Sequence, residues 1–398
     1  MSQIFKTIIS DFISTQNNGS MMSLVNYVRK KKVSDYEIAD LAISLSKTGE
    51  IIKTDKTLDL YDIPSTGGPS SLSTLLGPLF LRCLNKKVLK IGVPGRPAGG
   101  VDTLAQINGY NVNINPDIVN EKLMLFGYIH LLTNSSFVPL DGKFFKFRKE
   151  NQAVAIPSLV IASILAKKIA AGIKNIGLDI RVSNFGNFGN SWEEARINAN
   201  RFISVAALIG IKCTCFLSNG YTPQQPYIGR GESLLALQKI FQEKMNSSLE
   251  RHFGFCGSMA KSLVHEPSKV IGIKDIKNAF FENLRCQQGD KNHFYSIVTQ
   301  IETTHINKIT AKKNGYIKID LEQIRKSIIA IQENYTQIFP DPCGIILLKL
   351  DGDQVFKGTQ LCSFRCPAKF RDNFKVEMEK AFSISAFYEQ PYELEIVN

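Results

Sequence analysis

Residues 61–71 read YDIPSTGGPSS and lead directly into an apolar segment with helical spacing. In this first glycine turn, Gly67 and Gly68 allow backbone amides to converge on one point, and the following helix adds the positive end of its dipole. Hydroxyls such as those of Ser65 and Thr66 can donate to the same point. The stretch predicts a cradle for phosphate or a phosphorylated sugar, although a tight strand-to-helix turn with serine caps would use the same residues.

A second glycine turn, GVPGRPAGGVD at residues 92–102, follows an expected strand at residues 87–93. Turns that follow neighbouring parallel strands lie together at the carboxyl edge of a sheet, where ligands bind in open α/β folds. The pairing of two such turns favours the anion site over a plain turn.

Short β-branched runs alternate with helical segments from about residue 58 onward. Besides residues 87–93, we expect strands at residues 175–182 and 211–217, and helices at residues 71–83, 192–208 and 233–245. This alternation predicts an α/β fold, a sheet with crossover helices.

The change of pattern along the chain predicts three domains. Residues 1–57 form a helical domain that is completed by about residues 140–172, because their apolar positions recur at helical spacing. Residues 58–139 and 173–305 form the larger mixed α/β domain, which carries the glycine turns and binds phosphate and sugar. Residues 306–398 form a small α+β domain at the C-terminus. Its expected strands are 315–319, 344–350 and 359–365, and its expected helices lie near 320–334 and 370–381.

The composition is that of a globular protein, with 44% hydrophobic and 21% charged residues among 398. A net charge of +12 fits either a nucleic-acid binder or a protein that attracts a small anion. The densest basic run, residues 29–32, ends an expected helix, where cations complement the dipole. No surface of interleaved aromatic and basic residues is apparent in the sequence. We therefore expect a solvated basic face and no nucleic-acid binding.

Cysteine and histidine spacing argues against a metal site. The eight cysteines form no CxxC pair and the five histidines form no HxH or HxxxH pair. Reduced thiols, with no secretory signal in the sequence, indicate a cytoplasmic protein. The apolar run at residues 153–173 is interrupted by Lys167 and Lys168, so we expect a buried helix there and no membrane association.

The order of these motifs resembles that of thymidine and pyrimidine nucleoside phosphorylases, whose fold is shared with anthranilate phosphoribosyltransferase. An STGG sequence enters a helix, a strand follows, and a Gly-Gly-x-Asp-x-Leu turn comes at residues 99–104. The likeness continues through residues 31–38 and the glycine pattern of residues 315–358, and so runs through nearly the whole chain. It implies a pentosyltransferase of pyrimidine metabolism that cleaves a nucleoside with inorganic phosphate and needs no cofactor. It also implies a homodimer formed through the helical N-terminal domain.

The strongest part of the resemblance concerns the pocket for the nucleobase. The family holds the pyrimidine with an arginine, a serine and a lysine, and Arg148, Ser163 and Lys167 fall on those positions. Ser163 and Lys167 are four apart and therefore share one helical face. The family's aromatic residue before the arginine, usually tyrosine, is Phe145 here. The alternative is that Ser163 packs in a core while Lys167 and its neighbour end an apolar helix in solvent.

On the phosphate side the family pattern is only partly kept. Retained are Asp62, Ser65, Thr66, Gly67, Gly68, Gly99, Gly100 and a phosphate-binding hydroxyl that falls on Ser73 or Thr74. The family's lysine and histidine before the STGG sequence are replaced by Ile63 and Pro64. A threonine and a serine of the second turn fall on Val101 and near Gly92, and the Gly-Asn-x-x-Glu stretch is altered at residues 229–232. Arg96 or Lys90 could restore the missing charge from the second turn.

Three functions are compatible with this mixture. The first is a nucleoside phosphorylase with an altered phosphate site, whose domains close about hinges near residues 58–64 and 135–142. The second is a glycosyl-transfer enzyme with another acceptor or donor, such as water or a phosphoribosyl diphosphate. The third is a non-catalytic relative that binds a base or nucleoside. The sequence favours the first and leaves the base and sugar open.

Overall fold

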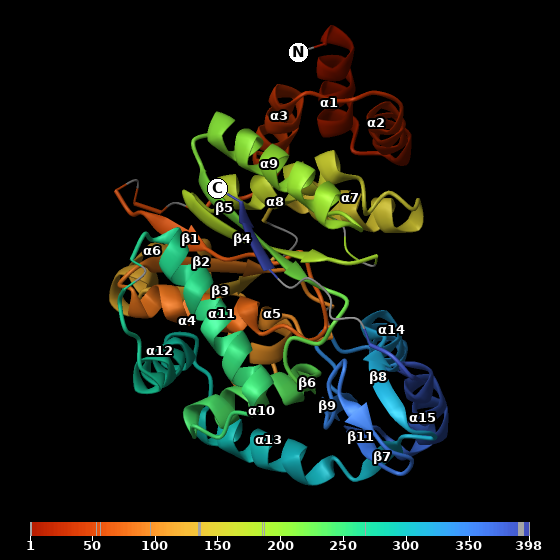
Figure 1. Cartoon of the computed structure of the whole chain (residues 1–398). Helices are drawn as coiled ribbons and strands as arrows, with labels where there is room; N and C mark the ends of the chain where they lie inside the picture. The colour runs from red at the N-terminus through yellow and green to blue at the C-terminus, as the bar shows by residue number, and fades with distance from the viewer. Residues whose placement is uncertain are drawn as a thin grey trace.

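The computed structural model describes residues 2–388 and 394–397, except for residues 53, 56, 96, 134–136, 185, 187 and 267. A twisted six-stranded sheet forms its centre, with strand order β13-β5-β4-β1-β2-β3 (Figure 1). The five strands β1 to β5 run parallel and β13 is antiparallel to β5. The bounds are β1 Leu60–Asp62, β2 Lys87–Gly92, β3 Tyr128–Leu132, β4 Asn175–Val182, β5 Lys212–Asn219 and β13 Leu394–Val397. The predicted α/β class is therefore confirmed.

Two layers of helices bury the two faces of this sheet, because successive side chains of each strand point to opposite faces. On β4, Ile176, Leu178 and Ile180 lie in one core cluster, together with helix α8 (Pro157–Ala170) and helix α9 (Trp192–Leu208). The opposite face packs against helices α4 (Ser73–Cys83), α11 (Ser247–Leu263) and α12 (Ile273–Cys286).

Three N-terminal helices extend the α8 side of the molecule, at the top of Figure 1. They are α1 (Gln3–Thr15), α2 (Asn18–Lys30) and α3 (Asp35–Ser46), and they share a core with α7 (Pro139–Glu150) and α8. Helix α3 begins at a capping box. The Ser34 side chain accepts from the Glu37 N–H, and the Glu37 carboxylate accepts from the Ser34 N–H at 2.8 Å.

Two small antiparallel sheets make up most of the remaining chain. One has the order β6-β9-β11-β7 and the other β10-β8-β12. Their bounds are β6 Tyr227–Ile228, β7 Asn307–Thr310, β8 Gly315–Ile319, β9 Gly344–Leu347, β10 Gln354–Val355, β11 Gln360–Arg365 and β12 Phe382–Ser385. The remaining helices are α5 Gly100–Leu104, α6 Pro116–Phe126, α10 Arg230–Phe241, α13 Lys291–Thr304, α14 Leu321–Gln332, the short 3-10 helix η1 Ala368–Phe370 and α15 Arg371–Lys380.

A buried charge network joins the smaller sheets to α10. Arg365 on β11 donates to the Glu232 carboxylate at 2.6 and 3.1 Å and to Asp341 at 2.6 Å. His305 lies 2.9 Å from the same Glu232 carboxylate. Burial alone would raise the pKa of Glu232, but Arg365 and His305 bring it down to about 2. The network thus fixes α10 against the C-terminal sheets.

The expected elements largely match the observed ones. The strand at residues 175–182 and the helix at 192–208 have the predicted bounds, whereas α10 begins three residues before its predicted start. The charged residues of this added first turn, Arg230 and Glu232, are buried in ion pairs. The three-domain division stays a proposal. Strands β6 and β13 cross its boundaries, since each pairs with a sheet outside its own segment. Within the described chain, no helix is both long and apolar enough to cross a bilayer.

Candidate active site

The first glycine turn lies along the end of β4. Beyond β1, Pro64 O accepts from the Asp179 N–H at 2.9 Å, and the Thr66 N–H donates to Asp179 O at 2.9 Å. The Arg181 N–H then donates to the Thr66 hydroxyl oxygen at 2.9 Å. The turn therefore continues β1 as a strand-like ladder and is held at the carboxyl edge of the sheet.

The turn needs its two glycines. Gly67 and Gly68 have φ values of +117° and +122°, which side-chain-bearing residues rarely adopt. The Gly67 N–H donates to the Ser65 hydroxyl at 3.2 Å. A Cβ built on Gly67 would meet no other atom within 4 Å, so the conformation, and not crowding, requires glycine here.

A compact polar cluster lies directly beneath this turn, and sequence reasoning found only part of it. The Arg181 guanidinium donates through Nη2 to the hydroxyl of Ser71 and to Asp179 Oδ2, the latter at 2.5 Å. The predicted Ser73 donates to the same Asp179 oxygen at 2.5 Å. The sequence signal for Asp179 and Arg181 was an Asp-x-Arg pattern near the end of a buried strand.

The second glycine turn meets the start of α4, as expected for turns after neighbouring strands. Gly99 is the N-cap residue of α5, and a Cβ added to Gly100 would come within 2.9 Å of Thr74 O and 2.7 Å of His130 Cε1. Gly100 is thus a point of close approach between the second turn and the start of α4. Of the predicted residues in this turn, Arg96 lies outside the described residues.

Lys90 occupies the position from which a charge could reach the first turn. Its ammonium donates to Ile63 O at 2.6 Å and pairs with Asp62 Oδ1 at 3.0 Å. The other oxygen of Asp62 pairs with Lys168 of α8. The lysine charges offset the burial of this carboxylate, and the pKa of Asp62 lies below its ordinary value although burial alone would raise it.

The structure brings together the predicted base-pocket residues. Lys167 Nζ pairs with Asp141 of α7 and donates to the carbonyl and hydroxyl oxygens of Ser163 at 2.8 and 3.0 Å. The Lys167 side chain is only 14% exposed. Burial lowers the pKa of Lys167, an effect that Asp141 opposes. The alternative in which Lys167 and Lys168 end a helix in solvent is therefore wrong.

Arg148 of α7 lies next to the cluster of Lys167, Ser163 and Asp141. Its guanidinium lies over the rings of Phe144 and the predicted Phe145, 5.2 and 5.6 Å from their centroids. Arg148 is 1% exposed, and its Nε and Nη1 have no hydrogen-bond partner among the described residues. Asp141 Oδ1 is likewise buried without a partner there. Orphaned donors and an orphaned acceptor therefore lie in one buried cluster, where a ligand with both kinds of group could satisfy them.

Two adjacent lysines link the base cluster to the glycine turns. Lys167 pairs with Asp141 of α7, while Lys168 turns toward Asp62 at the end of β1. A single turn of α8 thus contacts both halves of the candidate site.

The departures from the family pattern are built into the core. Ile63 is fully buried, and Cβ atoms added to Gly77 and Gly177 would come within 3.2 Å of its side chain. Val101 packs against Gly92, where an added Cβ would lie 2.7 Å from two of its carbons. Apolar packing therefore surrounds both Ile63 and Val101, two positions at which the sequence departs from the phosphorylase pattern.

Two buried histidines lie near the turns. Neither takes the place, as a proton donor, of the histidine that the family pattern has at Pro64. The ring of His130 contacts the Tyr128 hydroxyl at 2.9 Å through Nδ1, and burial lowers the pKa of His130 to about 3. His252 accepts from the Leu72 N–H at 2.8 Å through Nε2, and burial also lowers its pKa well below the ordinary value. Both rings are neutral at physiological pH.

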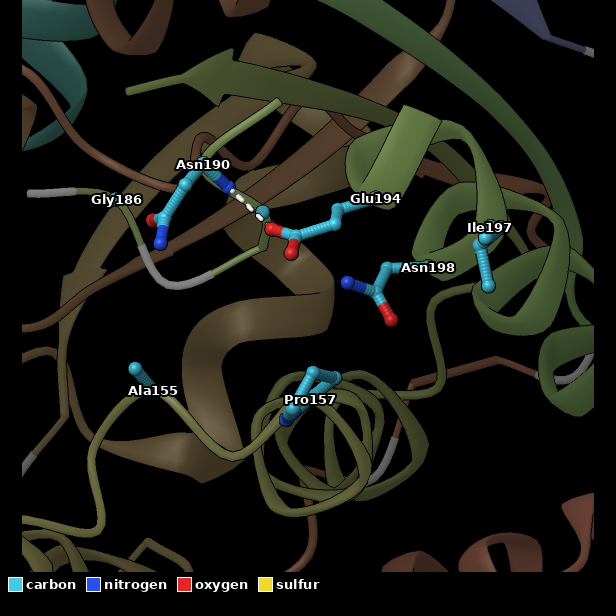
Figure 2. A pocket seen from close by; sticks show the side chains of 8 residues that line it. Ala155, Pro157, Gly186, Asn190, Glu194, Ile197 and Asn198 are labelled. Atoms are coloured by element: carbon cyan, nitrogen blue, oxygen red, sulfur yellow. Dashed lines mark hydrogen bonds between the residues drawn. The ribbon is translucent and has the colours of Figure 1, made fainter. Parts of the chain in front are cut away.

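A separate pocket of about 330 Å³ opens between the starts of α8 and α9 and the loop after β4 (Figure 2). Inside it the Asn190 N–H donates to the Glu194 carboxylate at 2.8 Å. It is lined by Ala155, Pro157, Gly186, Gly189, Asn190, Glu194, Ile197 and Asn198. None of these belongs to the predicted site, in which Arg148 and Ser163 are buried.

The fold and the site define an α/β protein with two glycine turns and buried cations at the carboxyl edge of a parallel sheet. The pyrimidine-nucleoside phosphorylase of Geobacillus stearothermophilus is 26% identical over 400 residues, which cover 92% of this chain and 88% of that protein. That of Staphylococcus haemolyticus (strain JCSC1435) is 27% identical over 416 residues, covering 96% and 93%. The thymidine phosphorylase of Agrobacterium fabrum (strain C58 / ATCC 33970) is 28% identical over 219 residues, covering 54% and 50%. The chain is thus similar over most of its length to proteins named pyrimidine-nucleoside phosphorylase, as the sequence predicted.

Similarity to solved structures is weaker. The anthranilate phosphoribosyltransferase of Thermus thermophilus has a TM-score of 0.47 and 13% identity, covering 74% of this chain and 97% of that chain. The enzyme from Saccharomyces cerevisiae has a TM-score of 0.49 and 11% identity, covering 71% and 86%. No protein-family model matches the chain.

Proposed function

We propose that the protein cleaves the N-glycosidic bond of a pyrimidine-type nucleoside and transfers the pentosyl group to inorganic phosphate. The observation that carries this proposal is the cluster of Arg148, Ser163 and Lys167, in which two buried guanidinium nitrogens lack a partner among the described residues. Relatives named as pyrimidine-nucleoside phosphorylases over most of the chain support the same reaction.

The chemistry of this cluster suits a departing base. When the bond between C1′ and the base nitrogen breaks, its electron pair stays on the base, and negative charge spreads to the ring carbonyl oxygens. The Arg148 and Lys167 side chains are fixed donors in a buried site, where they stabilise that charge more strongly than water does. A phosphate oxygen forms the new bond to C1′ and the proton that the phosphate loses goes to the base, so the products are a free base and a sugar 1-phosphate.

The first glycine turn and the Lys90 ammonium are the proposed phosphate side. Asp62, Ser65, Thr66, Gly67, Gly68, Ser73, Thr74, Gly99 and Gly100 are its proposed phosphate- or sugar-binding residues. Ser73 is the better candidate for the family's phosphate hydroxyl, since it lies beneath the turn, whereas Thr74 faces the second turn. A homodimer through the N-terminal helices and a cytoplasmic location are part of the proposal. The eight unpaired cysteines, all in described parts of the chain, support the location.

A second candidate is transfer to a different acceptor. One observation favours it: a buried Ile63 and the adjacent Pro64 stand where the phosphorylase pattern has a lysine and a histidine.

The test is to incubate the purified protein with a panel of pyrimidine and purine nucleosides and nucleotides, with and without phosphate, and to follow free base by chromatography. The proposal predicts release of a pyrimidine-type base that depends on phosphate. Release without phosphate would favour the second candidate. No release from any substrate, with a base or nucleoside still protecting against thermal unfolding, would favour a binding protein.

A further inference from the structure

Ile63 stands where the phosphorylase pattern has a lysine before the first glycine turn. The structure nevertheless places a cation, Arg181, beneath this turn. Arg181 is 3% exposed and lies at the end of β4, under the turn. A Cβ added to Gly68 would lie 3.7 Å from Arg181 Cγ, so the arginine side chain runs directly below the glycine.

The hydrogen bonding of Arg181 is incomplete. Nη2 donates to Ser71 Oγ and Asp179 Oδ2, and Ser73 Oγ lies farther away at 3.4 Å. Nε is buried and has no partner in the described part of the chain. A buried guanidinium donor without an acceptor costs free energy, so a native structure normally satisfies it with protein, water or ligand.

The charges around Arg181 do not balance. Among the described residues, five ionisable side chains lie at the carboxyl edge of β1, β2 and β4 and on the adjacent turn of α8, each 4% exposed or less. They are three cations, Lys90, Lys168 and Arg181, and two carboxylates, Asp62 and Asp179. Buried charges are normally compensated, and one further negative charge would complete this set.

We infer that Arg181 is the cation that binds a tetrahedral oxyanion of the phosphate class at the first glycine turn, with the Ser71 and Ser73 hydroxyls beside it. This inference rests on the proposed function and deepens it, because it assigns the phosphate side to a residue of β4. Asp179 holds the guanidinium in place through Nη2 and leaves Nε, which has no partner among the described residues, as a donor for the anion. The Arg181 N–H bond to Thr66 ties the same residue to the backbone of the turn.

The direct test is phosphate affinity, measured by isothermal titration calorimetry with inorganic phosphate alone. The variant Arg181→Met/Asp179→Asn removes a cation and a carboxylate together, so the net charge of the cluster is unchanged and no buried carboxylate is left unpaired. We expect its Kd for phosphate to rise about tenfold or more, the effect of losing a charged hydrogen bond. Stabilisation by a free pyrimidine base should be unchanged.

The matched control is Arg201→Met/Asp35→Asn, which removes another arginine–aspartate pair, 2.9 Å apart, between α9 and α3. Its phosphate affinity should equal that of the wild type. Ser71→Ala is the second variant in case the double variant does not fold, and it should weaken phosphate binding several-fold. The inference is overturned if the wild type does not bind phosphate, or if the folded variants bind phosphate within twofold of the wild type. Failure of the proposed function is separate, because it appears as phosphate binding without release of base.

Discussion

Replacing Lys167 by methionine should affect stability and catalysis through two contacts that can be separated. Its ammonium pairs with Asp141, which is 1% exposed, and donates to both oxygens of Ser163. Removing one partner of a buried ion pair costs about 3–5 kcal/mol of unfolding free energy. Losing one charged hydrogen bond to the departing base costs about 1.5–3 kcal/mol, or about 10- to 150-fold in kcat/KM.

The double variant Lys167→Met/Asp141→Asn separates the two effects. The buried carboxylate is gone, so most of the lost stability in urea denaturation should return, while kcat/KM for base release should stay about 10- to 150-fold below wild type. The assays are a denaturation curve and initial rates of base release for the wild type and both variants. If activity returned together with stability, the reasoning would be refuted, because Lys167 would then act only by compensating the buried charge of Asp141.

Three further predictions concern residues around the site. Ile63→Lys should lower the unfolding free energy by more than about 3 kcal/mol, because the side chain points into a core between Gly77 and Gly177. For the same reason it should not improve phosphate affinity. Tighter phosphate binding in calorimetry would contradict this prediction. His130 and His252 are neutral when folded and titrate near 6.5 when unfolded. Stability should therefore be full above pH 6.5 and fall by roughly 1.4 kcal/mol per pH unit per histidine below it; a flat profile between pH 6.5 and 5 in denaturation curves would count against it. Glu232→Gln should cost about 3–5 kcal/mol, because Arg365 would lose a buried carboxylate; an unchanged unfolding midpoint would show that the network contributes little.

Much of the fold follows from local patterns that the sequence carries openly. The β4 segment alternates buried residues between two faces, and α9 begins after Ser191, whose side chain accepts from the Glu194 N–H. Such signals act within a few residues and can be read from one segment. The short strand β6 and the terminal strand β13 could not be predicted, because each forms only by pairing with a distant segment.

The candidate site divides in the same way. Arg148, Ser163 and Lys167 could be proposed from the sequence because they follow a family spacing on neighbouring helices, and their role stays a proposal. Asp141 and Arg181 could not, since their importance comes from tertiary contacts: a carboxylate beneath a lysine, and a guanidinium beneath a turn more than a hundred residues away in sequence. The sequence allows Lys168 to end its helix in solvent. Only the structure reveals its ion pair with Asp62.

The central claim is the transfer of a pentosyl group to phosphate, and phosphorus NMR tests it most directly. The protein is mixed with inorganic phosphate and a nucleoside chosen from the panel, and the phosphorus spectrum is followed while free base is quantified. The account predicts a new sugar 1-phosphate resonance that grows in equal amount to the released base. Release of base while the inorganic phosphate signal stays constant would contradict it.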